Sequence, residues 1–267
     1  MVKGNVFEDA RFSSIAQRQF NYTPESMKHP AKMPPELARE LILAYSKKGD
    51  TILDPMAGIG TTIIESILLG RNAVGVEYEQ KFKEIIDKNI DLTVKNNGKS
   101  VAKRKLGKAI VIKGDARSLC SLMKEKIDSG VFSPPYSETF DSKRNTSSGL
   151  VYSKDPQNIG NKDGQTYLSE MKKVYGECYK ALKPGGFMVL VTKNFRRGGR
   201  EINLLSDTIK LCEIVGFELY QIAYHKLNGA SFWQVNAAIK ANQKGEPLLL
   251  PLIEHVIILK KPRKATK

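Results

Sequence analysis

The chain has 267 residues, enough to bury the core of one α/β domain. Lysine and arginine outnumber aspartate and glutamate by 43 to 28, so the formal net charge is +15. This excess favours a polyanionic partner, and nucleic acid is the simplest candidate. Charge alone does not decide the question, because many basic proteins merely carry solvated lysines.

The three cysteines argue against a disulfide framework and against structural zinc, because they are odd in number and never form a CxxC pair. No segment is long and apolar enough to cross a bilayer, and the first twenty or so residues contain no signal-like apolar stretch. We therefore expect a soluble, cytoplasmic protein with no membrane partner and no metal. The oligomeric state is left open.

Residues 1–30 are polar and irregular, and we expect them to form an N-terminal extension of a single domain that spans residues 1–267. Residues 137–165 lack apolar periodicity and are expected to form a long substrate loop. Apolar periodicity and turn residues elsewhere predict helices over 34–49, 63–69, 81–97, 167–182 and 204–215, and strands over 51–53, 72–77, 109–113, 130–132, 187–192, 217–224 and 254–259. The alternation indicates a doubly wound, Rossmann-like α/β fold with a mostly parallel, seven-stranded sheet.

A glycine-rich turn between the first predicted strand and its helix has the features of a nucleoside site. Gly58 and Gly60 would let backbone amides approach a ligand at the helix N-terminus. Glu77, at the end of the next strand, suits two ribose hydroxyls, and Asp115, after the third, can accept from an adenine amino group. These three strand ends predict a nucleoside-type cofactor, and the absence of a GxxxxGK[ST] spacing makes ATP less suitable.

A second turn, Ser133-Pro134-Pro135-Tyr136, follows the fourth predicted strand. Two prolines fix its backbone and remove two amide donors, so the turn offers acceptors. An exocyclic amino group is a poor nucleophile until both of its N–H groups donate hydrogen bonds to acceptors. The Ser133 hydroxyl and the Pro134 carbonyl can accept these bonds. Tyr136 would stack on a base that is unpaired or has left its helix. The alternative is a rigid strand-to-loop turn without function.

Two motifs resemble those of a known family. Asp54 to Thr62 resembles the DPxxGxGTT motif, and Ser133 to Tyr136 the SPPY motif, of the amino-methyltransferases that act on DNA or RNA bases. Residues 29–34 resemble the family's HPxxKP segment, which borders the methionine end of the cofactor. The likeness covers roughly residues 25 to 195. It implies a class I methyltransferase fold, S-adenosylmethionine as cofactor and direct methyl transfer without a covalent enzyme intermediate.

The resemblance also implies roles for individual residues. A serine at the first SPPY position goes mainly with N4 of cytosine, whereas Asp or Asn goes mainly with N6 of adenine or with glutamine, so Ser133 indicates cytosine. Methylation at C5 would need a cysteine nucleophile, and none lies beside this turn. The expected cofactor-binding residues are His29, Lys32, Asp54, Met56, Ala57, Gly58, Gly60, Thr61, Thr62, Glu77, Tyr78, Asp115, Ala116 and Ser133.

The polymer is inferred from what the chain lacks. DNA-modifying relatives usually carry a sizeable target-recognition region, and here only the loop 137–165 is spare. We therefore expect RNA, either rRNA or a ribosomal subunit, as for archaeal-type rRNA cytidine-N4 methyltransferases, with N4-methylcytidine or its dimethyl form as product. A basic stretch after the fifth strand can grip phosphates beside the pocket, although a solvated loop explains it equally well; it contains Lys193, Arg196, Arg197 and Arg200.

Three alternatives stay open. The first is a site-specific DNA methyltransferase acting on cytosine N4 or adenine N6. The second is a noncatalytic RNA-binding protein that keeps the methyltransferase fold. The third, a protein glutamine methyltransferase, is disfavoured by Ser133 and by the net charge of +15. His225 and His255 lie in strand-like runs and are expected to be structural.

Overall fold

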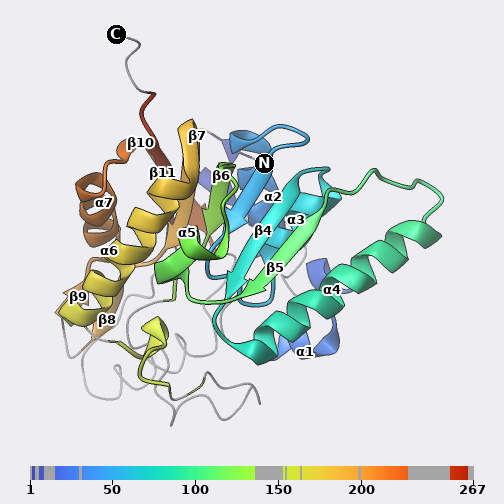
Figure 1. Ribbon diagram of the computed structural model, residues 1–267, viewed down its shortest axis with the longest axis horizontal. Coiled ribbons are helices and arrows are strands. Elements are labelled where there is room, and N and C mark those ends of the chain that lie inside the picture. The colour runs from blue at the N-terminus through green and yellow to red at the C-terminus, as the bar shows by residue number, and fades with distance from the viewer. Residues whose placement is uncertain are drawn as a thin grey trace.

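The computed structural model describes residues 2–3, 6–8, 16–29, 32–135, 153, 155–162, 164–197, 200–227 and 253–263. Its centre is a nine-stranded sheet in the order β1-β2-β10-β11-β7-β6-β3-β4-β5 (Figure 1). The seven longer strands are β3 (Thr51–Asp54), β4 (Asn72–Glu77), β5 (Ala109–Lys113), β6 (Ile127–Phe132), β7 (Leu182–Thr192), β10 (Glu218–Lys226) and β11 (Ile253–Lys260). These seven correspond to the seven predicted strands.

Strands β3 to β7 all run parallel, and only β11, among the seven longer strands, runs antiparallel to its neighbours β7 and β10. Consecutive parallel strands need crossover connections, which here contain the helices. The longer helices are α2 (Pro35–Tyr45), α3 (Thr61–Leu68), α4 (Gln80–Lys99), α6 (Gly164–Ala181) and α7 (Leu204–Ile214). The predicted Rossmann-like fold class is confirmed.

Helices cover both faces of the sheet (Figure 1). Neighbouring residues of one strand point to opposite faces, so Val131 packs with α2 whereas Phe132 packs with α6. Helices α3 and α4 lie on the same face as α2. Ile52 of β3 packs with α2, and Ala73 of β4 packs with α3 and α4. These two residues are paired in the sheet, so their side chains point to the same face. Among the described helices none is both long and apolar enough to span a membrane.

The described residues among the first thirty pack onto the sheet and its helices, although polarity predicts an irregular extension. Two short strands, β1 (Val2–Lys3) and β2 (Val6–Glu8), continue the sheet, with β2 parallel to β10. A 3-10 turn, η1 (Ala16–Arg18), and a short helix, α1 (Pro24–Met27), lead to α2. Arg18 is fully buried, and Asn89 of α4 accepts a hydrogen bond from the Thr23 amide. Apolar periodicity does not report packing of this kind.

Several boundaries also differ from the prediction. Helix α6 begins at Gly164, inside the expected loop, and β7 begins at Leu182, before the predicted strand start at residue 187. The basic stretch after β7 forms a two-stranded hairpin, β8 (Phe195–Arg197) and β9 (Arg200–Ile202), that was not predicted. The remaining short elements are η2 (Ala116–Ser118), α5 (Leu119–Leu122) and η3 (Ile159–Asn161).

Candidate active site

The glycine turn after β3 favours glycine at its last position. Gly60 has a φ of 82°, and a Cβ there would lie 2.8 Å from Cγ2 of Ile86. The Gly60 amide donates to the carbonyl of Ala57 at 2.7 Å, and α3 begins at the next residue, Thr61. The first amides of α3 therefore point at the carboxyl edge of the sheet, the edge where the parallel strands end.

Two buried carboxyl groups lie beside this turn. Glu77 accepts hydrogen bonds from the Gly58 amide at 2.7 Å and from the Glu79 amide at 2.8 Å, one on each oxygen. Burial raises the pKa of Glu77 to about 7, and repulsion from Asp54 adds to the rise. Burial also raises the pKa of Asp54 to about 7. Each Glu77 oxygen keeps a lone pair for another donor, which fits a pair of ribose hydroxyls.

His29, the first residue of the HPxxKP-like segment, packs against the same turn. The ring of His29 lies 3.6 Å from the place of a Cβ on Gly58 and meets the Phe82 ring edge-on at 4.5 Å. Lys32 donates to the Met27 carbonyl at 3.1 Å and also to the carbonyl of His29. Burial, assisted by the nearby charge of Arg18, lowers the pKa of Lys32 to about 8. The structure thus places His29 at the glycine turn and bonds Lys32 to the carbonyl of His29.

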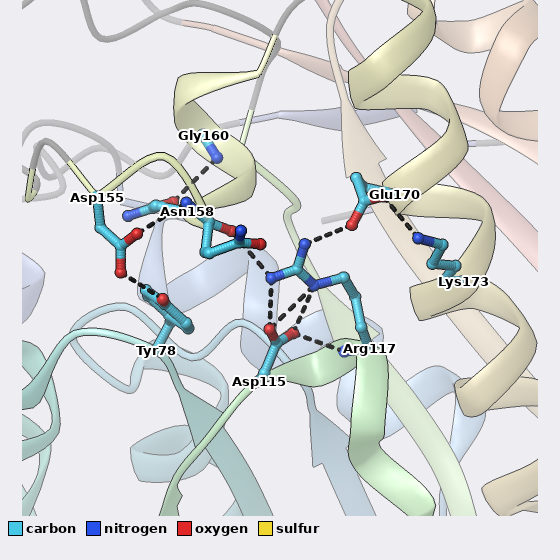
Figure 2. A network of polar contacts seen from close by, with 9 residues as sticks. Tyr78, Asp115, Arg117, Asp155, Asn158, Gly160, Glu170 and Lys173 are labelled. Atoms are coloured by element: carbon cyan, nitrogen blue, oxygen red, sulfur yellow. Dashed lines mark hydrogen bonds and ion pairs between the residues drawn. The ribbon is translucent and has the colours of Figure 1, made fainter.

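Asp115 is held by an arginine that the sequence analysis did not consider (Figure 2). Arg117 binds both Asp115 oxygens through Nε at 2.9 Å, and it also pairs with Glu170 of α6. Its Nη2 donates to the carbonyl of Gln157 at 3.0 Å. Asp115 can reach an adenine amino group only in addition to these bonds, or after Arg117 moves. That contact stays a prediction.

The described end of the expected substrate loop is held at the residues that follow β4. Tyr78 donates to Asp155 at 2.5 Å, and this bond raises the pKa of Tyr78 to about 12 (Figure 2). The buried Glu79 accepts from the Asn158 side chain and from the Ser153 amide, both at 2.8 Å. No spacing in the sequence signals these pairs, because their members are more than 70 residues apart. Residues 136–152 lie outside the described part.

The SPPY turn is fixed by two hydrogen bonds from opposite sides. The Ser133 hydroxyl donates to the carbonyl of Val191 in β7 at 3.0 Å. The hydroxyl of Tyr167, a buried residue of α6, donates to the carbonyl of Pro135 at 2.7 Å, and burial raises the pKa of Tyr167. Pro134 is buried between them. Since its hydrogen is used by Val191, the Ser133 oxygen can serve as an acceptor.

The glycine turn and the SPPY turn are neighbours. Strands β3 and β6 are paired in parallel, with Leu53 opposite Gly130, so both strands end at the carboxyl edge. Adjacent strands are about 4.8 Å apart, which places Asp54 and Ser133 on adjoining strand ends. Tyr136, expected to stack on the base, lies outside the described residues. The remaining expected cofactor residues occupy the turn and the first turns of α3 and η2; they are Met56, Ala57, Thr61, Thr62 and Ala116.

The basic stretch also begins at this edge. Lys193 directly follows β7 and is half-buried, and burial lowers its pKa. Arg196, Arg197 and Arg200 lie on the β8–β9 hairpin, with Arg197 opposite Arg200, but the structure describes only their backbones. Within the described ranges no three potential metal ligands gather into one group.

Comparison with known proteins supports the resemblance drawn from the motifs. Residues 2–88 match the family model N6_N4_Mtase, described as DNA methylase. The type II methyltransferase M.MthZI of Methanothermobacter thermautotrophicus is 43% identical over 77 residues, which is 29% of this chain and 22% of the relative. M.BglI of Bacillus subtilis is 32% identical over 108 residues, 39% of this chain and 31% of the relative. The chain aligns with about a quarter of these relatives' lengths.

The DNA adenine methyltransferase YhdJ of Escherichia coli is 31% identical over 104 residues, 39% of this chain and 33% of the relative. Among solved structures, TrmN from Thermus thermophilus matches with a TM-score of 0.56 at 15% identity, covering 91% of this chain and 52% of that one. A methyltransferase from Pyrococcus furiosus matches with a TM-score of 0.54 at 15% identity, covering 93% of each chain. These structures show a shared methyltransferase fold.

The likeness to amino-methylases of the DNA N4-cytosine and N6-adenine type is confirmed. The expected preference for RNA is not supported, because the matching family model and YhdJ are described as acting on DNA. RNA was expected from the small part of the chain left for target recognition. Size alone does not identify the polymer.

Proposed function

We propose that this chain transfers a methyl group from S-adenosylmethionine to the N4 amino group of cytosine in DNA. The observation that carries the proposal is the hydrogen bond from the Ser133 hydroxyl to the Val191 carbonyl. It commits the only hydrogen of that hydroxyl to the protein and leaves the oxygen as an acceptor beside the glycine turn.

An acceptor is what this reaction needs from the protein. The lone pair of an exocyclic amino group is delocalised into the base, and accepting hydrogen bonds from both N–H groups favours the tetrahedral form that can attack. Ser133 would accept one bond and the carbonyl of Pro134 the other. Tyr167 holds the turn in place through Pro135, so the two acceptors are oriented before the base arrives.

The residues at the glycine turn fit the cofactor. Glu77 would bind the ribose hydroxyls, the first amides of α3 would face the cofactor's polar groups, and Tyr78 with Asp115 would flank the adenine. His29 and Lys32 would border the methionine end. When bound, S-adenosylmethionine supplies an electrophilic methyl group, and the protein's part is to align the amino nitrogen with it and to exclude water.

The target base must leave the duplex to reach Ser133, because an enzyme cannot bring these groups to an amino group that is paired inside the helix. DNA is favoured over RNA by the DNA methylase relatives, and the serine at position 133 supports cytosine over adenine. The net charge of +15 suits either polymer.

The test is methyl transfer from labelled S-adenosylmethionine to unmethylated genomic DNA and, in parallel, to ribosomal RNA and ribosomal subunits. We expect label in DNA and N4-methyldeoxycytidine after digestion to nucleosides. Label confined to RNA would refute the polymer, and N6-methyladenine would refute the base. Binding of S-adenosylmethionine without transfer to any substrate would indicate the noncatalytic alternative.

Replacing Ser133 by Ala should slow transfer about 10- to 150-fold, the effect of losing one hydrogen bond of roughly 1.5–3 kcal/mol in the transition state. Affinity for S-adenosylhomocysteine should change little. Ser169, an exposed residue of α6, provides the matched control S169A. An S133A enzyme as fast as S169A would exclude Ser133 from the mechanism.

A further inference from the structure

A row of side chains changes from apolar to polar where the sheet meets the catalytic turn. Four neighbouring strands place buried residues on the face that α2 covers, namely Val131, Val191, Val256 and Ala223. Side chains alternate along a strand, so the same face carries Lys193, Glu254 and His225 two residues nearer the carboxyl edge. Ser133 follows Val131 on this face, and the register of β6 and β7 sets it level with Val191, two residues before Lys193. In the sheet, Glu254 is paired with His225 on one side. On the other side His255 is paired with Thr192 in an antiparallel register, which sets Glu254 beside Lys193.

Lys193 lies close to the catalytic turn. Ser133 bonds to the carbonyl of Val191, two residues before Lys193, and in the parallel register of β6 and β7 the next residues of the SPPY turn run alongside Lys193. The lysine is half-buried, and no residue in the described part of the chain accepts a hydrogen bond from its ammonium group. A partly desolvated cation is stabilised by a ligand that accepts a hydrogen bond from it.

Glu254 is the charged neighbour of this cation. Its carboxylate raises the pKa of Lys193, against the lowering caused by burial. Glu254 is itself held by the buried His225, whose Nδ1 lies 2.9 Å from Oε2. The result is a charged donor at the base site with a carboxylate behind it.

We propose that Lys193 reads the target base by donating a hydrogen bond to the ring carbonyl O2 of cytosine. This inference rests on the proposed function. The amino group and O2 lie on the same Watson–Crick edge, so one flipped base can meet Ser133 at one end and Lys193 at the other. Adenine carries a C–H group where cytosine carries O2, so Lys193 would favour cytosine.

A phosphate contact, the role expected from the sequence, fits these surroundings less well. The adjacent carboxylate of Glu254 would repel a phosphate, whereas it does not disfavour a neutral carbonyl. Phosphate contacts are also made by hydrated side chains at the surface, and Lys193 is half-buried. Lys193 is therefore separated in function from the arginines of the β8–β9 hairpin.

The experiment compares the wild type with K193M, which keeps the length of the side chain and removes its charge. Exposed Lys210 on α7 provides the matched control K210M. Affinity is measured for a duplex with cytosine at the target and for the same duplex with an abasic target, each over a range of salt concentrations. Binding of S-adenosylhomocysteine checks that each variant is folded, and K193Q replaces K193M if K193M does not bind it.

K193M should lose most of the preference for cytosine over the abasic target and should methylate with kcat/KM lowered about 10- to 150-fold, as for one lost charged hydrogen bond. The dependence of affinity on salt should not change. E254Q should lose part of the same preference, because Lys193 would lose its neighbouring charge.

The proposal would be overturned if K193M kept the cytosine preference and its plot of log affinity against log salt concentration had a slope smaller by about 0.9. That result would show that Lys193 binds phosphate. K193M that matches K210M in every measurement would also overturn it. A wild-type protein that methylates no DNA would refute the proposed function. An active wild type with an equally active K193M would refute only the role of Lys193.

Discussion

The buried carboxyl group of Glu77 should make the stability of the free protein fall with rising pH while the affinity for the cofactor rises. In the folded protein its pKa is about 7, against an ordinary value of 4.5. Between these values the folded state holds a proton that the unfolded state has released, so the free energy of unfolding falls as pH rises. At 1.36 kcal/mol for each pH unit, the loss is about 3 kcal/mol by the time Glu77 is fully ionised.

Cofactor affinity should rise over the same range, because ribose hydroxyls donate to the ionised carboxylate. The affinity should fall roughly tenfold for each pH unit below 7, which amounts to about 100-fold at pH 5. S-adenosylhomocysteine is the suitable ligand, since none of its own groups titrates in this window. The measurements are urea unfolding of the free protein and calorimetric binding of this ligand, both from about pH 5 to pH 8.

The variant E77Q should flatten both curves, leaving the contribution of Asp54, whose pKa is also raised to about 7. The control is E84Q, which changes an exposed glutamate of α4 and should keep both wild-type slopes. Wild-type stability that stays level or increases from pH 5 to pH 8, or an E77Q protein with unchanged slopes, would refute the assignment of these effects to Glu77.

Two further predictions concern the turns. G60A should lower the free energy of unfolding by about 1–3 kcal/mol and weaken cofactor binding, because its Cβ meets Ile86 and its φ of 82° disfavours a side chain; urea unfolding measures this. G98A, where a Cβ meets nothing within 4 Å, is the control, and equal stability of the two would contradict the argument. Y167F should lower kcat while S-adenosylhomocysteine affinity stays unchanged, because the Pro135 carbonyl loses its donor; an unaltered kcat would show that the turn is held without it.

The sequence predicts best where a strand is a short apolar run between turn residues. Strands β4 and β5 have the predicted bounds, because Asn72–Glu77 and Ala109–Lys113 are bounded in this way. The ends of these strands also predict the candidate cofactor residues, since parallel strands bring their carboxyl ends to one edge. The order of the motifs therefore carries most of the information on the site.

The sequence predicts poorly where polar side chains pack on each other. Arg117 reads as one more surface arginine, yet it joins Asp115, Gln157 and Glu170 from three different elements. Fully buried Arg18 reads in the same way. Contacts of this kind depend on the three-dimensional arrangement of distant segments and have no period along the chain.

The bonds that hold residues 153–158 have a thermodynamic consequence. Glu79 and Tyr78 stand next to Glu77 in the chain, and they hold this segment by hydrogen bonds to Asn158 and Asp155. The other end of the same loop leaves the SPPY turn. Coupling free energies are reciprocal. If docking of this segment raises the affinity for the cofactor by some factor, bound cofactor raises the equilibrium constant for docking by the same factor. Cofactor binding near Glu77 would then stabilise the loop that leaves the SPPY turn, where the target base would bind.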